Sequence, residues 1–349
     1  MSRPEQKSAL NIVMGCMTFG REGTEGARVH TAEEVGKILD VFQAHGHYEL
    51  DSARTYAGGT SEEILGEVGW QQRGLVMDTK LYPNAASTRW TQPGANRISH
   101  SPEDLRKYLD VSLKALIGNR SVQRTAPSID MWYLHGPDRT TPYEVTLKAV
   151  NDLYKEGKFK RFGISNYMSW EVAEIVSICK ANGYIMPSAY QGIYNAIHRK
   201  VEPELFPCLR KFGIAFYEFN PLGGGFFTGR YRSMQDEVEP GSRFDPNKGQ
   251  GRNYRARYWN ETYFQALALI EEVAKKHSLT LAEIALRWVS HHSLMKREHG
   301  DAIIIGASSL NHIEQNLVDL EKGPLPEEVL KVLDQAWDLV KPVATNYFH

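Results

Sequence analysis

The sequence predicts a (β/α)8 TIM barrel with long loops on its C-terminal face, and two observations support this prediction. Short apolar runs alternate with stretches of helical periodicity along most of the chain, which is typical of parallel strands joined by crossover helices. The rival architecture, an open doubly wound sheet, should carry a GxGxxG turn after its first strand, but this chain has "GCMTFG" there. No linker-like Pro/Ser tract interrupts the alternation, so we expect one barrel domain over residues 1–349.

Eight short apolar runs are the candidate barrel strands. Their lengths suit buried parallel strands, and helical segments separate them. They lie near residues 10–14, 47–51, 75–80, 129–134, 159–164, 187–191, 214–219 and 302–306.

Three of the intervening segments carry clear helix boundaries. Each opens on a serine or threonine that can cap the first turn, and Glu34 and Asp104 stand three residues after two of these caps, as in a capping box. Each ends at a glycine, the usual residue just past a helix. The predicted caps are Thr31, Ser101 and Thr141, and the glycines are Gly46, Gly118 and Gly157.

The overall composition is that of an ordinary globular protein, with 42% hydrophobic and 24% charged residues. A formal net charge of −1 argues against nucleic acid or an anionic membrane as a partner. The three cysteines are far apart and form no CxxC, which favours a reducing compartment. The first residues lack the apolar core of a signal peptide, and no apolar run approaches membrane-spanning length. We therefore expect a cytoplasmic protein.

Long connections point to the functional face of the barrel. Residues 81–100 and about 223–260 each follow a predicted strand, so they should lie on the C-terminal face, where barrels bind and transform ligands. A third connection, 118–127, follows a helix and should lie on the opposite face.

Four proton-active side chains stand at or just past the ends of successive strands. Asp51 ends the second strand and Tyr56 follows it in a glycine-flanked loop, while Lys80 and His135 end the third and fourth strands. Taken singly, these could be a cap, a loop aromatic, a surface charge and a rim histidine. Because neighbouring strands lie about 5 Å apart, the four can meet in one cavity mouth, which favours a catalytic site.

Carbonyl reduction is the chemistry that needs this set of groups. A tyrosine with a pKa near 10 is a poor acid at neutral pH, but a nearby Lys80 ammonium should lower the pKa of Tyr56, and Asp51 should keep that lysine charged. His135 can orient a carbonyl oxygen while Tyr56 protonates it. Hydride must come from a cofactor, because no side chain can supply it.

These residues carry a family resemblance over nearly the whole chain. The motifs are "MTFG", "DSARTY", "TKLYP", "WYLHGPD", "FGISNY", "YQGIYNA", "FNPLGGGFFTGRY", "YRARYW" and "IIIGASSLNHIEQNL". In their order and spacing the chain resembles the aldo-keto reductases, and within them the aflatoxin-aldehyde reductase branch with its fungal members. The resemblance implies NADPH/NADP+ as cofactor and Asp51, Tyr56, Lys80 and His135 as the catalytic tetrad, with Tyr56 as general acid. The implied substrate is a small carbonyl compound: an aromatic aldehyde, a dialdehyde or a short carboxylated aldehyde.

The resemblance also implies cofactor positions. The segment after the fifth and sixth strands matches the residues that bind the nicotinamide carboxamide, the segment after the seventh lines the pyrophosphate, and the segment after the eighth holds the adenosine-phosphate end. The positions are Met17, Asp51, Ser165, Asn166, Gln191, Phe219, Asn220, Pro221, Leu222, Gly224, Arg243, Ser308, Ser309, His312, Gln315 and Asn316.

Two of these positions depart from the family pattern. Phe219 stands where the family usually has a tyrosine that stacks on the nicotinamide, so stacking is retained without a hydroxyl. His312 stands where the family commonly has Arg or Gln near the 2′-phosphate, and Arg243 in the long loop can supply the positive charge instead.

For the substrate, the expected apolar walls are Tyr82, Trp90, Tyr194 and Met17, and the candidates for an anionic group are Arg255 and Arg257. The resemblance is compatible with a monomer or a homodimer.

Other functions stay open at this point. "HGH" at 45–47 suggests a metal-dependent barrel hydrolase, but it precedes the second strand, on the wrong face, so we expect no metal. A Schiff-base aldolase using Lys80 would leave the cofactor-like segments unexplained. An aryl-alcohol dehydrogenase running in reverse, or a nicotinamide-binding regulatory subunit with little turnover, would use the same residues.

Overall fold

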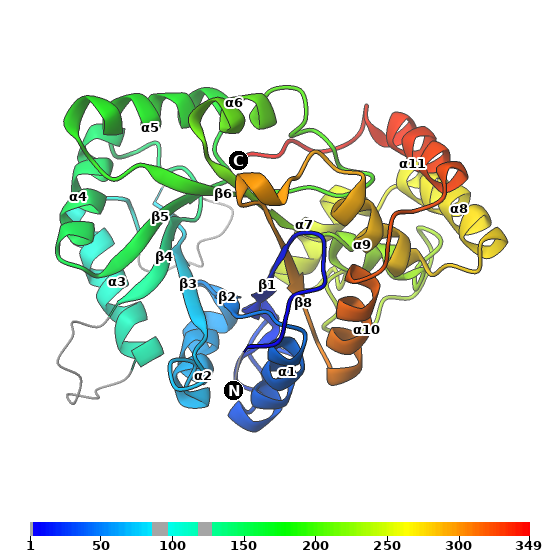
Figure 1. Ribbon diagram of the computed structural model, residues 1–349, viewed down its shortest axis with the longest axis horizontal. Helices are drawn as coiled ribbons and strands as arrows, with labels where there is room; N and C mark the ends of the chain where they lie inside the picture. The colour runs from blue at the N-terminus through cyan, green and yellow to red at the C-terminus, as the bar shows by residue number, and fades with distance from the viewer. Residues whose placement is uncertain (1–2, 86–96, 118–127) are drawn as a thin grey trace.

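The structure is a computed structural model that describes residues 3–85, 97–117 and 128–349. Eight parallel strands close into a barrel in sequence order, and the first pairs with both the second and the eighth. Helices surround the barrel (Figure 1). The predicted (β/α)8 barrel is confirmed; the predicted connection 118–127 lies outside the described residues.

The strands follow the predicted runs closely. The second is the shortest, with three residues. The strands are β1 (Asn11–Gly15), β2 (Glu49–Asp51), β3 (Val76–Leu81), β4 (Ile129–Leu134), β5 (Phe159–Ser165), β6 (Pro187–Ile193), β7 (Ala215–Phe219) and β8 (Ala302–Gly306).

The helices lie mainly between successive strands, and the long segment between β7 and β8 contains η3, α7, α8, α9 and η4. Among the described residues, none of the helices combines the length and apolarity needed to cross a membrane. The α-helices are α1 (Ala32–Ala44), α2 (Thr60–Val68), α3 (Pro102–Ile117), α4 (Tyr143–Lys155), α5 (Ser169–Asn182), α6 (Leu205–Phe212), α7 (Gly249–Tyr258), α8 (Glu261–Lys276), α9 (Leu281–His291), α10 (Leu310–Leu320) and α11 (Glu327–Val340), and the 3-10 helices are η1 (Cys16–Thr18), η2 (Tyr56–Gly59), η3 (Gly223–Thr228) and η4 (Arg297–His299).

Two of the predicted caps are in place. At α1 the Glu34 N–H donates to the Thr31 hydroxyl, and the Thr31 N–H donates back to the Glu34 carboxylate, a complete capping box. At α3 the Asp104 N–H donates to the Ser101 hydroxyl at 3.2 Å. The Asp104 carboxylate instead accepts from the Ser99 N–H, so the predicted box is one-sided there.

The predicted cap of α4 is wrong by one residue. Pro142, not Thr141, occupies the N-cap position. The Thr141 hydroxyl donates to the Asp138 carboxylate at 2.8 Å, so the loop before the helix uses the side chain that would have capped it.

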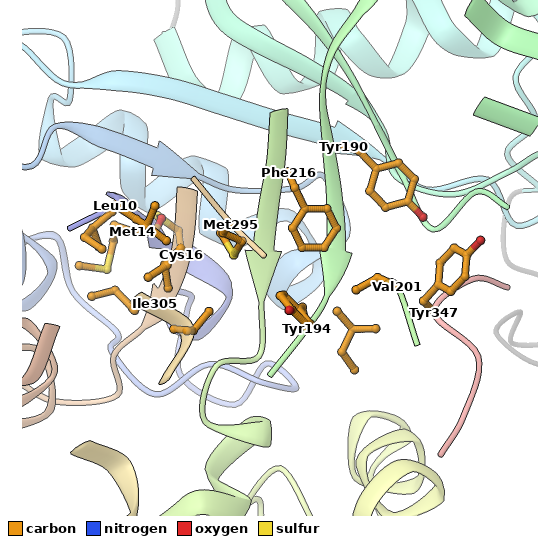
Figure 2. Packing of buried hydrophobic residues seen from close by; sticks show 14 of the residues in the cluster. Leu10, Met14, Cys16, Tyr190, Tyr194, Val201, Phe216, Met295, Ile305 and Tyr347 are labelled. Carbon is orange, nitrogen blue, oxygen red and sulfur yellow. The ribbon is translucent and has the colours of Figure 1, made fainter. Parts of the chain in front are cut away.

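Apolar side chains fill the space inside the barrel and the space between strands and helices. The inner cluster includes Tyr133, which fits because Gly163 opposite it has no side chain: a Cβ there would overlap the tyrosine ring. The outer cluster packs strands against helices, as Figure 2 shows for Phe216 and Tyr194. The barrel is therefore a packed core that is open only at its ends.

A cluster of charged side chains lies at the end of the barrel where the strands begin. Carboxylate oxygens of Glu49, Asp78 and Asp130 lie close enough together to hold a metal ion. Arg161 instead donates to Glu49 at 2.8 Å and to Asp130 at 2.6 Å. Burial raises the pKa of Asp78 well above its usual value. Arg161 thus offsets part of the negative charge of this cluster, and the raised pKa of Asp78 opposes its ionisation.

Buried histidines should make the fold sensitive to acid. Burial lowers the pKa of His47 and of His100 to about 4, and neither ring has a hydrogen-bond partner within residues 3–85, 97–117 and 128–349. An unfolded histidine binds its proton near pH 6.5, so the unfolded chain takes up more protons between pH 6.5 and 4, and acidification favours unfolding. We expect the free energy of unfolding, measured with urea, to fall across this range by about 1–3 kcal/mol per histidine. His100→Gln should make the fall smaller; an unchanged pH dependence in that variant would contradict this.

Candidate functional site

One cavity of about 2180 Å³ opens at the C-terminal ends of the strands. Its walls come from strand ends, the connection after β1, the long segment after β7, the start of α10 and the last residues of the chain. This volume exceeds that of a usual small-molecule pocket of about 300–1,000 Å³. The cavity can therefore take a dinucleotide together with a small substrate.

The four predicted proton-active residues meet at the deep end of this cavity. Asp51, Tyr56 and His135 line the wall, and Lys80 lies fully buried behind them. The Lys80 Nζ donates to Asp51 Oδ2 at 2.6 Å and to the Ser52 carbonyl at 2.7 Å. It also lies 4.9 Å from the centre of the Tyr56 ring. The rings of Tyr56 and His135 meet edge to face, with centroids 5.8 Å apart.

The proton of Tyr56 is held more tightly than the sequence predicts. Burial raises the pKa of Tyr56 to about 12, although the charge of Lys80 and its hydrogen bond to the phenol lower it. The prediction that Lys80 lowers the pKa is right in its direction, but the desolvation of the phenolate outweighs it. Tyr56 is therefore a neutral proton donor over the whole physiological range.

Lys80 stays charged despite its burial. Desolvation opposes the ammonium, but Asp51 and then Tyr56 raise the pKa of Lys80 above its usual value. The other carboxylate oxygen of Asp51 accepts from Gln191 Nε2 at 2.8 Å. Asp51 is thus held from two sides, by a cation and by an amide.

His135 is neutral in this environment. Burial, and then the charge of Lys80, lower the pKa of His135 well below its usual value. The Asn166 side chain donates to the main-chain carbonyl of His135 at 2.9 Å, which fixes the strand end. A neutral imidazole can donate one hydrogen bond into the cavity without adding charge.

Most of the predicted cofactor positions line the cavity. Ser165 and Ser309 do not: the buried Ser165 hydroxyl accepts from Asn166, and Ser309 caps α10 by accepting from the His312 N–H. The lining residues among the predicted set are Met17, Asp51, Asn166, Gln191, Phe219, Asn220, Pro221, Leu222, Gly224, Arg243, Ser308, His312, Gln315 and Asn316.

The end of the cavity away from Tyr56 suits a phosphate-bearing group. The N-terminus of α10 faces it, where backbone N–H groups and the helix dipole favour an anion. Arg243 reaches over the end of β8, with its guanidinium 3.5 Å from where a Gly306 side chain would begin. The buried Asn220 amide nitrogen has no partner among the described residues. A helix end, a cation and a free amide donor are groups that can bind a phosphate-bearing ligand.

The predicted substrate residues divide into two groups. Tyr82 and Arg257 line the cavity. Tyr194 does not: it is fully buried among Phe216 and neighbouring side chains (Figure 2), and its hydroxyl donates to Glu202. Arg255 also lies elsewhere, with its guanidinium over the Trp259 ring at 4.2 Å. Trp90 lies outside the described residues.

Two walls of the cavity are not predicted by any sequence motif. The last residues return to the site after α11: the His349 N–H donates to the Asn166 carbonyl at 3.3 Å, and its ring lies 6.1 Å from that of Tyr82. Arg28 comes from the connection after β1 and donates to the Gly241 carbonyl across the cavity. Neither residue belongs to a motif, so only the fold brings them to the site.

Comparison with known proteins agrees with this geometry. The model of the aldo/keto reductase family matches residues 11–338. An aldo-keto reductase of Pseudocercospora fijiensis is 49% identical over 89% of this chain and 100% of its own. Aldo-keto reductase pigE of Monascus ruber is 45% identical over 98% of both chains. The human aflatoxin B1 aldehyde reductase member 2 is 43% identical over 100% of this chain and 92% of its own.

The buried Lys80–Asp51 pair yields a test of stability. Asp51→Asn should leave an uncompensated ammonium in the barrel mouth and destabilise the protein by about 3–5 kcal/mol. Adding Lys80→Met removes that charge, so the double variant should recover part of the loss. Urea unfolding of the wild type, both single variants and the double variant measures this; a double variant less stable than Asp51→Asn alone would contradict the interpretation.

Proposed function

The chain belongs to the aldo/keto reductase family, and from that premise we propose that it reduces aldehydes to alcohols with NADPH as the hydride donor. Carbonyl reduction is the family's general activity; the cofactor, the acid and the substrate class are our proposal. The observation that carries it is a neutral Tyr56 at the cavity surface, backed by a buried lysine–carboxylate pair.

The cofactor would lie along the cavity. Asn166 and Gln191 can hold the nicotinamide carboxamide, Phe219 can stack on the ring, and the start of α10 with Arg243 can hold the phosphates. NADPH supplies the hydride when bound there. Gln191, which would hold the carboxamide, is hydrogen-bonded to Asp51, so this end of the cavity would receive the nicotinamide close to Tyr56.

Tyr56 is the proposed general acid. As the carbonyl carbon accepts hydride, the carbonyl oxygen takes the phenol proton of Tyr56, and the resulting phenolate is stabilised by the Lys80 ammonium. Water then returns a proton to the phenolate. The neutral His135 donates a hydrogen bond to the same oxygen and fixes its direction. The reverse sequence of these steps oxidises an alcohol, so the cofactor ratio in the cell sets the direction.

Arg257 supports aldehydes that carry a carboxylate among the substrates. It lines the cavity, and no carboxylate partner is present for it among the described residues. Tyr82 and His349 line the same cavity. Burial raises the pKa of Tyr82 and lowers that of His349, and the charge of Arg257 acts downward on both. Relatives named as aflatoxin B1 aldehyde reductases support an aldehyde as the reacting group.

Tyr56→Phe tests the general acid. It removes one hydroxyl and should lower kcat/KM for 4-nitrobenzaldehyde by about 10²–10⁴-fold, because the hydrogen bond from neutral His135 does not replace the proton that Tyr56 transfers. NADPH consumption at 340 nm measures turnover, and quenching of protein fluorescence measures cofactor affinity, which should change little. Tyr154→Phe, at an exposed position on α4, is the matched control.

Two outcomes would contradict this proposal. Full activity in Tyr56→Phe would exclude the phenol as the acid. Tight NADPH binding by the wild type without turnover of any aldehyde would favour a nicotinamide-binding regulatory subunit instead.

Arg257→Met tests the carboxylate subsite. Loss of a charge-assisted hydrogen bond should raise KM for 2-carboxybenzaldehyde by about 10–100-fold and leave KM for uncharged 4-nitrobenzaldehyde nearly unchanged. Arg255→Met is the matched control, since that side chain lies over Trp259 outside the cavity. An equal rise for both aldehydes would show that Arg257 acts on the shape of the cavity and not on the carboxylate.

A further inference from the structure

Tyr56 is held by an unusually constrained turn. Residues just past β2 continue to pair with β3: the Ser52 N–H donates to the Asp78 carbonyl and the Arg54 N–H to the Lys80 carbonyl. Immediately after Tyr56 the backbone takes left-handed conformations, with φ of 46° at Ala57, 62° at Gly58 and 98° at Gly59. Such a conformation costs a non-glycine residue about 1–2 kcal/mol, so other contacts must hold the turn.

Arg54 supplies the clearest of these contacts. Its guanidinium crosses the turn and lies directly on Gly59, where a Cβ would overlap Nη2. From there Nη1 donates to Glu62 Oε2 on α2 at 2.5 Å. Arg54 therefore clamps the turn against α2 from the side away from the cavity.

Glu62 links this clamp to the strand that carries Lys80. Its carboxylate is fully buried, and its second oxygen accepts from the Thr79 hydroxyl at 2.6 Å. Thr79 directly precedes Lys80 on β3. Burial raises the pKa of Glu62, and the charge of Arg54 opposes this increase. One chain of contacts thus runs from the Tyr56 turn through α2 to the backbone of Lys80.

The side chains of this chain of contacts, Arg54, Glu62 and Thr79, do not line the cavity. The neighbouring residues Thr55, Tyr56, Ala57 and Gly58 do. Arg54, Glu62 and Thr79 therefore contact neither substrate nor cofactor in the proposed mechanism. They contact the turn that carries Tyr56 and the strand β3 that carries Lys80. The distance between these two segments fixes the distance between the Tyr56 phenol and the Lys80 ammonium.

We propose that Arg54 and Glu62 are positioning residues that hold the Tyr56 hydroxyl against the Lys80 ammonium. This inference rests on the proposed role of Tyr56 in aldehyde reduction. Without Arg54 the turn loses the side chain that covers Gly59, and Glu62 becomes a buried carboxylate without a cation, a state that proteins relieve by protonation or rearrangement. Tyr56 then samples positions away from Lys80, and displacements of about 1 Å can cost about 10²-fold in rate.

The chain offers a matched control for removing this arginine. Arg210 on α6 pairs with the fully buried Asp301 at 2.5 Å, at the end of the barrel opposite the cavity. Arg54→Met and Arg210→Met each leave a fully buried carboxylate without its guanidinium. Both should lower thermal stability, but only Arg54→Met should affect Tyr56.

The experiment reads Tyr56 directly by NMR of protein labelled with 13C at tyrosine Cζ. The Tyr56 signal is identified by its absence in Tyr56→Phe, and this measurement needs no turnover. We expect it to shift or broaden in Arg54→Met and to stay unchanged in Arg210→Met. If Arg54→Met folds poorly, Glu62→Gln serves in its place, because it keeps the shape of the side chain and removes the charge that pairs with Arg54. We expect it to shift or broaden the Tyr56 signal in the same way. A Tyr56 signal unchanged in Arg54→Met and Glu62→Gln overturns the inference.

Kinetics add a second test. In Arg54→Met we expect kcat to fall by about 10–100-fold with little change in KM or in NADPH affinity. In the Tyr56→Phe background the same substitution should have almost no further effect, because residues that act through one group are non-additive. A fully additive loss contradicts the positioning role. An inactive wild type would contradict only the proposed function. The NMR measurement needs no turnover, so it would still test whether Arg54 and Glu62 position Tyr56.

Discussion

The barrel mouth depends on one buried charge. Lys80 has no exposed surface, and an ammonium can stay charged there only if carboxylate and carbonyl oxygens replace its water. Asp51 and the Ser52 carbonyl do so, both from the end of β2. In the pairing of β2 with β3, Asp51 lies beside Asp78, which is two residues before Lys80. The long side chain of Lys80 therefore spans this offset to reach the Asp51 carboxylate on the neighbouring strand.

Burial is the main reason that the two rings beside Lys80 stay neutral, and the charge of Lys80 opposes this effect at Tyr56 and reinforces it at His135. For Tyr56, burial and Lys80 act in opposite directions on the pKa, and burial wins, so the phenol keeps its proton. For His135, burial and Lys80 act together, so the imidazole stays neutral. One cation therefore prepares a proton donor that can become an anion and a neutral hydrogen-bond donor that does not compete with it.

The sequence predicts this end of the site well and the cavity walls poorly, for a physical reason. Asp51, Lys80 and His135 end strands whose register in a closed barrel is fixed, so their positions follow from the fold class alone. Tyr194 directly follows β6 and its side chain faces the core, whereas Arg255 lies on α7, far beyond the end of β7, and its side chain lies over Trp259. The direction of a side chain in such segments depends on packing that the strand register does not fix. His349 reaches the site only because the chain returns after α11 and binds Asn166, a contact between distant residues that no local pattern encodes.

The two sides of the barrel mouth carry different kinds of residue, and this difference makes the two ends of the cavity chemically distinct. β2, β3 and β4 end in the groups that handle protons, whereas β1 and β8 end in the paired glycines Gly15 and Gly306, both on the cavity wall. A Cβ at Gly15 would come within 3.0 Å of Ile304, so a larger residue would fill the opening there. Because these strand ends carry no side chain, the cavity extends over them to α10 and Arg243. The open side thus leaves room for the extended dinucleotide that we propose, and Tyr56 lies on the other side.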